Sequence, residues 1–259
     1  MKISVALAQL DLKFGDPENN ILKAQEAVQR ASTQGAEIVL LPELWASGFD
    51  LEHAWEYASS LNEGWFARMR SLAEEFGIVV GGSMIEEDQG DYYNSFALYD
   101  KTGNLLGSYR KIHLFQKLQE HIHFKGGKKV AVINSPWGKI GLAICYDLRF
   151  PEIFRTCAIE GAELILLVAE WPRQRIEHWK ILLQARAIEN QCFIAAVNKA
   201  GASQGAALGG NSAVVNPMGE FLILGGENEE LLQAAFDLDE VSKIREWMPV
   251  FDDLRPGSY

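Results

Sequence analysis

The sequence contains little cysteine and no long hydrophobic run. Three cysteines in 259 residues, an odd number, do not resemble the dense and paired set of a disulfide-stabilised secreted domain. The longest apolar run in the interior, residues 164–169, is far shorter than the ~20 residues of a membrane span. The apolar start of the chain before Asp11 is too short for a persuasive signal peptide. We therefore expect a soluble protein in the reducing cytoplasm, without a membrane partner.

Basic residues are scarce relative to acidic ones. The chain has 24 lysines and arginines against 35 aspartates and glutamates, so its formal net charge is −11. An acidic protein repels the phosphates of nucleic acids and of anionic membranes, so neither is an expected partner. A small anionic substrate remains compatible with this charge, because the field inside a pocket can differ from the net charge.

Several common catalytic and cofactor motifs are absent. The chain has no G-x-S-x-G, no H-E-x-x-H, no paired C-x-x-C and no P-loop, and its glycine-rich residues 201–210 lack a phosphate-binding pattern. His121 and His123, near His113 and Glu120, are a weak metal candidate because no recognised ligand spacing accompanies them. We expect that segment to be a flexible pocket loop, and we expect neither a metal nor a cofactor.

Short apolar runs alternate with amphipathic stretches along the whole chain. The spacing of apolar residues predicts helices at 19–34, 62–76, 151–160, 176–190 and 239–247. Strand patterns occur at 3–9, 38–41, 78–83, 96–109 (a hairpin turning at 100–104), 130–134, 140–144, 163–168, 192–198 and 231–236, with two further strands around 216–220. Because no linker or repeat interrupts them, these elements predict one α/β domain over residues 1–259 with mixed sheets.

Three reactive residues each follow a predicted strand: Glu43, Lys111 and Cys145. Taken singly, a glutamate or lysine at a strand end is usually a solvated residue, and a cysteine there is often part of the core. Taken together they suit acyl transfer, because a thiol needs a base and the developing oxyanion needs donors. Cys157 and Cys192 fall within predicted elements, and we interpret them as core residues.

The segments around these residues, "LLPELWASGFD", "YRKIHLF" and "GLAICYDLRFPE", resemble in order the three signature segments of the nitrilase superfamily of carbon–nitrogen hydrolases. The resemblance implies an αββα sandwich and a catalytic triad of Glu43, Lys111 and Cys145. It also implies that the Tyr146 N–H joins Lys111 in the oxyanion hole. Glu120 matches a second glutamate that positions the substrate amide or the lysine, although a surface carboxylate is the alternative.

Two further segments, "AEWPRQRIEHW" and "MPVFDDLRPGSY", resemble the omega-amidase-like branch of that superfamily and its bacterial members associated with methionine salvage. This implies hydrolysis of a short linear monoamide such as 2-oxoglutaramate through a cysteine thioester. Arg175 is then the candidate for the substrate carboxylate, and Trp171 for the pocket wall. Arg149 is a second candidate, but we expect it to pair with a neighbouring carboxylate and brace the turn after Cys145.

Other readings remain open at the level of sequence. The substrate could be a different amide, such as deaminated glutathione or an N-carbamoyl compound. The chain could also be a catalytically idle subunit of the same fold, although retention of all three triad residue types argues against it. The resemblance implies a homodimer, with the elements after Cys145 and the helix at 176–190 as the interface.

Overall fold

The computed structural model describes residues 1–258, and its first sheet combines the N-terminal half of the chain with the last strand. The strand order is β14-β1-β2-β3-β4-β5. Strands β1, β2 and β3 run parallel, and the remaining pairs are antiparallel. The bounds are β1 Lys2–Gln9, β2 Ile38–Leu40, β3 Val79–Asp88, β4 Asp91–Tyr99, β5 Leu105–Arg110 and β14 Glu230–Asp237.

The second sheet has the order β13-β12-β9-β8-β7-β6, with parallel strands β7, β8 and β9 at its centre. Its strands are β6 Ala131–Ser135, β7 Gly138–Ile144, β8 Leu164–Ala169, β9 Phe193–Asn198, β12 Ala213–Val215 and β13 Phe221–Leu224. A separate small hairpin consists of β10 Ala202–Ser203 and β11 Ala206–Ala207.

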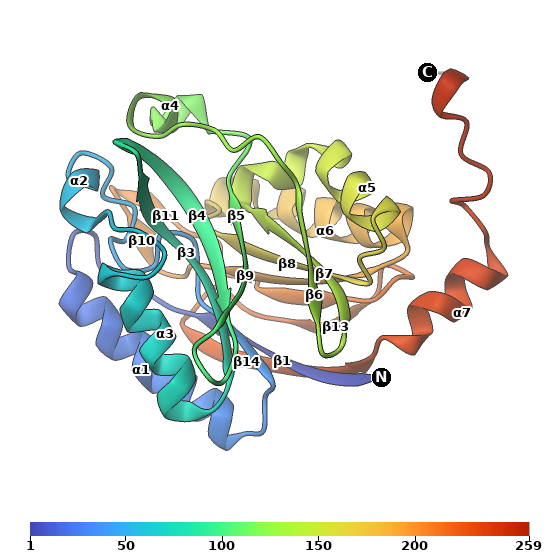
Figure 1. Cartoon of the computed structure of the whole chain (residues 1–259), viewed down its shortest axis with the longest axis horizontal. Helices are drawn as coiled ribbons and strands as arrows, with labels where there is room; N and C mark the ends of the chain where they lie inside the picture. Colours follow the sequence, from blue (N-terminus) through green and yellow to red (C-terminus); the bar gives the residue numbers. More distant parts are fainter. Residues whose placement is uncertain (259) are drawn as a thin grey trace.

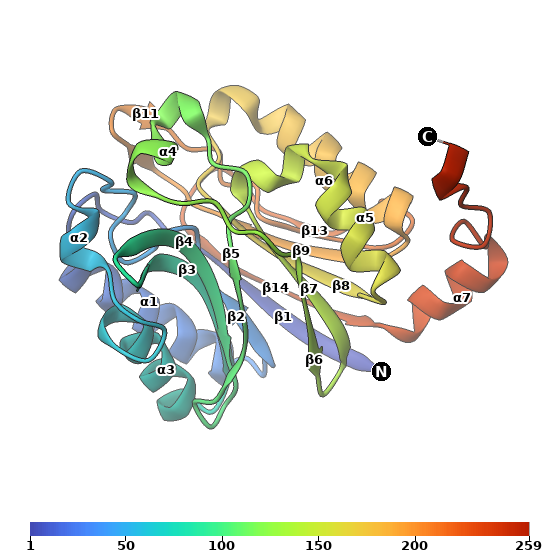
Figure 2. The ribbon, with the colours of Figure 1, turned by 45° about the horizontal axis from the view of Figure 1, so that its top comes forward.

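Four helices form the outer layers. Helices α1 (Pro17–Thr33) and α3 (Gly64–Phe76) cover the first sheet, and α5 (Pro151–Ile159) and α6 (Ile176–Asn190) cover the second (Figure 2). The short helices α2 (Ala54–Tyr57) and α4 (Glu120–His123) lie with the β10–β11 hairpin at one end of the sandwich, and α7 (Asp239–Trp247) lies at the other (Figure 1). The predicted αββα sandwich with mixed sheets is confirmed.

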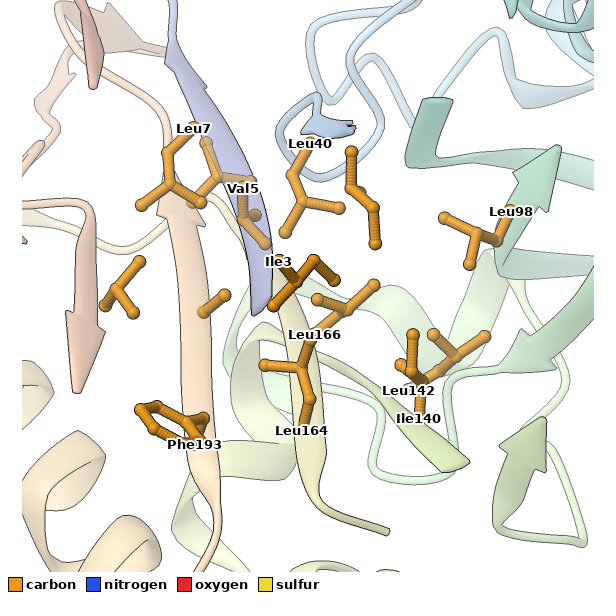
Figure 3. Packing of buried hydrophobic residues seen from close by; sticks show 14 of the residues in the cluster. Ile3, Val5, Leu7, Leu40, Leu98, Ile140, Leu142, Leu164, Leu166 and Phe193 are labelled. Carbon is orange, nitrogen blue, oxygen red and sulfur yellow. The ribbon is translucent and has the colours of Figure 1, made fainter. Parts of the chain in front are cut away.

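The alternation of side chains along the strands explains why the layers stack in this way. In β1, Ile3, Val5 and Leu7 enter the core between the two sheets, whereas Ala6 and Ala8 pack beneath the helices. Figure 3 shows the first group against residues of the second sheet, among them Leu164 and Leu166. Both faces of each sheet are therefore buried, which requires a helix layer on each outer side.

Most predicted elements are confirmed, and two of the helices match at both ends: 176–190 and 239–247. The strand predicted at 78–83 is wrong at its C-terminal end, because β3 continues to Asp88 in register with β4. Its glycines are required by packing rather than by a turn: a Cβ at Gly82 would lie 3.0 Å from the Trp45 ring. The flexible loop expected at 120–123 is wrong, since these residues form α4.

No helix among residues 1–258 combines the length and the apolar character that a membrane crossing requires.

Candidate active site

Glu43, Lys111 and Cys145 come from three different strand ends and meet at one end of the sandwich. Lys111 Nζ lies 2.8 Å from Glu43 Oε1 and 2.7 Å from Glu120 Oε1. The side chains of Lys111 and Glu43 are fully buried, and that of Glu120 is 1% exposed. The structure therefore brings together the four residues that the sequence proposed for catalysis, with one ammonium between two carboxyl groups.

The two oxygens of Glu43 have different partners. Oε1 accepts hydrogen bonds from Lys111 Nζ and from Asn94 Nδ2, each at 2.8 Å. Oε2 accepts the backbone N–H of Glu170 at 3.0 Å. The carboxylate is thus held in one orientation by three donors, one of them from the other sheet.

The charges around Lys111 determine its protonation. Burial alone would lower the pKa of Lys111, but the carboxylates of Glu120 and Glu43 outweigh this effect and raise that pKa well above its usual value. Burial also raises the pKa of Glu120, against the lowering effect of Lys111. Glu120 Oε2 in addition accepts the N–H of Phe115 at 2.9 Å, which attaches the loop before α4 to the site.

Cys145 has a strained backbone and a thiol whose pKa is raised. Its φ of 45° is in the left-handed region, at the point where β7 turns into a 3₁₀ segment over Cys145–Arg149. Burial raises the pKa of the Cys145 thiol well above its usual value; the nearby Glu43 carboxylate adds to this rise, and Lys111 opposes it. A neutral thiol next to a carboxylate needs general-base assistance to attack, which is the arrangement of a base-activated nucleophile.

The turn after Cys145 is braced by Asp147, whose side chain is fully buried. Its Oδ2 accepts from the Tyr109 hydroxyl at 2.8 Å and from the N–H of Ile144 at 3.1 Å. Its Oδ1 accepts from the N–H of His113 and contacts the Nδ1 of the same residue, both at 3.0 Å. One carboxylate therefore links the nucleophile's turn to the segment that carries Lys111.

Cys145 opens into a cavity of about 660 Å³. The cavity is lined by aromatic and charged residues from several loops: Phe49, Phe115, Glu120, Tyr146, Arg149, Glu170, Trp171 and Arg175. Ser203, Gln204, Ala206, Ala207 and Leu208, in and just after the small hairpin, complete the lining named here. Trp171 is 2% exposed, and its Nε1 donates to the Arg175 carbonyl at 2.8 Å. The sequence-based assignment of Trp171 and Arg175 to the pocket is consistent with this position.

Residues 4–246 match the carbon–nitrogen hydrolase family. The chain belongs to this family. It is 38% identical over 260 residues to the 2-oxoglutaramate amidase of Bacillus subtilis (strain 168), with all of both chains covered. It is 33% identical to the human omega-amidase NIT2, covering 99% of this chain and 97% of that one.

A solved structure resembles this hydrolase closely in its fold. It is a mutant of the amidase from Nesterenkonia sp. AN1 in which acrylamide has added to the active-site cysteine. The TM-score is 0.84 at 30% identity, with 95% of this chain and 100% of that chain covered. The nitrilase-superfamily assignment is confirmed, and the protein is a carbon–nitrogen hydrolase.

The expectation for Arg149 in this hydrolase is wrong. Within residues 1–258 its guanidinium has no carboxylate partner; it lies 4.8 Å from the centre of the Trp171 ring and contacts His178 Nδ1 at 3.5 Å. Burial lowers the pKa of Arg149, and the nearby Arg175 lowers it further. The turn is braced instead by Asp147 and by Arg186, which donates through Nε and Nη2 to the Leu148 carbonyl at 3.1 and 2.9 Å.

Sequence reasoning missed several residues around the hydrolase site. Asn94 lies two residues before the strand predicted to begin at residue 96. Extending that strand would have marked Asn94 as a polar residue on the face of Phe96 and Leu98, where the alternation predicts an apolar one. Asp147 was visible in the motif next to Tyr146. Glu170 and Lys199, which form a buried ion pair behind Glu43, carried no local signal, because their pairing depends on how β8 and β9 end.

Proposed function

We propose that this carbon–nitrogen hydrolase is an omega-amidase that cleaves 2-oxoglutaramate and similar short linear monoamides to a carboxylate and ammonia. One observation carries the proposal: Cys145, Glu120 of the buried Glu43–Lys111–Glu120 cluster, and two arginines without carboxylate partners in the described chain border the same cavity. The names of the bacterial and human relatives support the same substrate class.

The first half-reaction forms a thioester. Cys145 Sγ attacks the amide carbon as Glu43 takes the thiol proton, and the oxyanion is stabilised by Lys111 Nζ and the Tyr146 N–H. Glu43 then transfers this proton to the amide nitrogen, the C–N bond breaks, and ammonia leaves. The charged form of Lys111 that its surroundings favour is the form that stabilises an oxyanion.

The second half-reaction returns the free enzyme. Water attacks the thioester carbon while Glu43 accepts one of its protons, and the same donors again stabilise the oxyanion. The C–S bond breaks and the sulfur regains a proton from Glu43. The carboxylic acid leaves and gives its own proton to the solvent, which yields the carboxylate. Glu120 acts by holding Lys111 in place through the 2.7 Å contact.

The arginines give the pocket its selectivity for an acid. Arg175 lies over the Phe115 ring at 5.6 Å and Arg149 over the Trp171 ring at 4.8 Å, so aromatic faces support both guanidiniums. Their N–H groups remain suited to bidentate pairing with a carboxylate. We assign Arg175 as the main partner of the substrate's distal carboxylate, Arg149 as its neighbour, and Trp171 as the wall between them.

A substrate panel tests this function. Turnover of 2-oxoglutaramate, succinamate, butyramide, an N-carbamoyl amino acid and deaminated glutathione is measured under one set of conditions by ammonia or product release. The proposal predicts the highest kcat/KM for the two monoamide acids. Faster hydrolysis of butyramide, or of either bulkier compound, would reassign the substrate, and failure to turn over any amide would indicate an idle subunit.

We also propose that residues 1–259 form one catalytic domain and that the enzyme is a cytoplasmic homodimer. Large apolar side chains stand exposed on the outer helices: Ile159 on α5, and Ile181 and Ile188 on α6, are 60%, 61% and 52% exposed. Exposed apolar surface of this kind is typical of an interface. The three free cysteines are compatible with a reducing compartment.

A further inference from the structure

A second buried ion pair lies directly behind the catalytic cluster. Lys199 Nζ, at the end of β9, donates to Glu170 Oε2 at 3.2 Å, and the two side chains are 0% and 6% exposed. Glu170 also borders the cavity. Charges this deeply buried are costly to maintain, so a pair beside an active site calls for an explanation.

The backbone of Glu170 contacts the base itself. Glu43 Oε1 already accepts hydrogen bonds from two nitrogens, whereas Oε2 accepts one N–H, that of Glu170. A carboxylate oxygen has two acceptor sites, so Oε2 retains the free site that can take the proton of Cys145. The Glu170 N–H therefore orients the reactive oxygen.

Residues at the end of β9 hydrogen-bond to the backbone of Ala169 and Trp171, the two neighbours of Glu170. The N–H of Lys199 donates to the Ala169 carbonyl at 3.1 Å. Asn198 Oδ1 accepts the N–H of Trp171 at 2.6 Å, and Asn198 Nδ2 donates to the Trp171 carbonyl at 3.2 Å. The Glu170–Lys199 contact adds a side-chain link between the ends of β8 and β9. This link is made by Glu170, the same residue whose N–H donates to Glu43.

The pair also affects the charge around the base. The charged and titratable groups that surround Glu43 are Lys111 after β5, Glu120 on α4, Cys145 after β7 and Glu170 after β8, with Lys199 behind Glu170. Burial raises the pKa of Glu170 and the Glu43 carboxylate adds to the rise, whereas Lys199 and a hydrogen bond to Ser203 oppose it. An ionised Glu170 with its lysine contributes no net charge.

We propose that Glu170 and Lys199 form a positioning pair for the catalytic base, fixing the N–H that orients Glu43 and keeping the buried surroundings of Glu43 electrically balanced. This inference rests on the base role proposed for Glu43. It requires that removal of Glu170 and removal of Lys199 have opposite effects on Glu43, because the first leaves a positive charge near the base and the second a negative one.

The test uses Glu170→Gln, Lys199→Met and the double variant. Glu170→Gln leaves an unpaired positive charge near Glu43, so the acid limb of kcat/KM for the amide should move to lower pH by about 0.5–1 unit. Lys199→Met leaves the carboxyl group without its cation, so the limb should move to higher pH by a similar amount. The double variant is neutral again, and its limb should return close to that of the wild type.

The same pH series is run on the alkylation of Cys145 by iodoacetamide, which requires no substrate. Glu229→Gln, which breaks the exposed ion pair with Lys23, is the matched control and should leave both profiles unchanged. If Lys199→Met does not fold in a thermal scan, Glu170→Gln and the double variant still decide the matter. Activity losses without displaced limbs, or a double variant displaced as far as Glu170→Gln, would overturn the proposal. Retention of the wild-type alkylation profile in Glu43→Gln would instead refute the base role itself.

Discussion

Lys111 Nζ donates to Glu43 Oε1 across 2.8 Å, although the two residues are 68 positions apart and both side chains are fully buried. Removing one partner of a buried pair typically costs about 3–5 kcal/mol, because the other charge is left uncompensated. Here the lysine faces a second carboxyl group, that of Glu120, so the cluster behaves as one electrostatic unit. Substitutions of the individual residues in this cluster should therefore affect different steps of catalysis, and by different amounts.

Cys145→Ala should abolish turnover and leave the fold intact, because the variant removes the nucleophile and little volume. Treatment of the wild type with iodoacetamide should have the same effect. Since burial and Glu43 raise the pKa of the thiol, its reaction with the alkylator should accelerate as the pH rises. Circular dichroism serves as the folding control. Full activity in Cys145→Ala, or loss of activity with a chelator alone, would refute the mechanism.

Glu43→Gln should be far more damaging than Glu120→Gln. The first removes the base, whose contribution is on the order of 10²–10⁴-fold, so acylation should nearly stop. The second keeps a hydrogen-bonding group near Lys111 and should lower kcat less. Mass spectrometry of each variant after substrate addition measures thioester formation directly. An acyl-enzyme that forms in Glu43→Gln as fast as in the wild type would contradict the assignment.

Arg175→Met should lower kcat/KM for 2-oxoglutaramate and succinamate by about 10–100-fold, as expected when a charged hydrogen bond of roughly 1.5–3 kcal/mol is lost. Butyramide has no carboxylate, so its turnover should hardly change. Steady-state kinetics on the three amides provide the comparison. Equal losses on acids and on butyramide would mean that Arg175 supports the site without contacting the carboxylate.

Asp147→Asn should destabilise the protein more than Tyr109→Phe does. Both carboxylate oxygens of Asp147 accept hydrogen bonds, whereas an asparagine side chain has only one acceptor oxygen. In the variant, the NH₂ group must therefore face two buried donors that an Asp147 oxygen satisfies in the wild type. Each mismatched buried donor costs about 1–3 kcal/mol. Tyr109→Phe removes the bond to Asp147 and the bond from the Ile112 N–H, and leaves only that N–H without its acceptor. Denaturant unfolding measures both variants. Equal stability of the two would show that Asp147 does not brace the turn.

Ile181→Glu should convert the proposed dimer to monomer, because it places a charge on the exposed apolar surface of α6. Leu22→Glu is the matched control: Leu22 is 65% exposed on α1, at the other outer layer. Multi-angle light scattering at micromolar concentration gives the mass of each. A monomeric wild type with full activity, or a dimeric Ile181→Glu, would count against this interface.

The sequence by itself determined the α/β elements and, through its resemblance to a known family, the chemistry. The period of two along β1, which directs Ile3 and Val5 to one face and Ala6 to the other, and the helical period at 176–190 are local properties. Each local period requires a particular face to be buried, so the pattern predicts one α/β domain with mixed sheets, whereas the αββα sandwich is what the family resemblance implies. The segments carrying Glu43, Lys111 and Cys145 likewise lie within short stretches that resemble a known family.

Only the tertiary structure decided which groups surround those residues. The Glu170 N–H reaches Glu43 across 127 positions, and Glu170 pairs with Lys199 across 29. Arg149 faces Trp171 and the cavity, and Asp147 and Arg186 brace the turn in its place. Such contacts depend on how loops from both sheets pack over the strand ends, and no residue spacing within one segment carries that information.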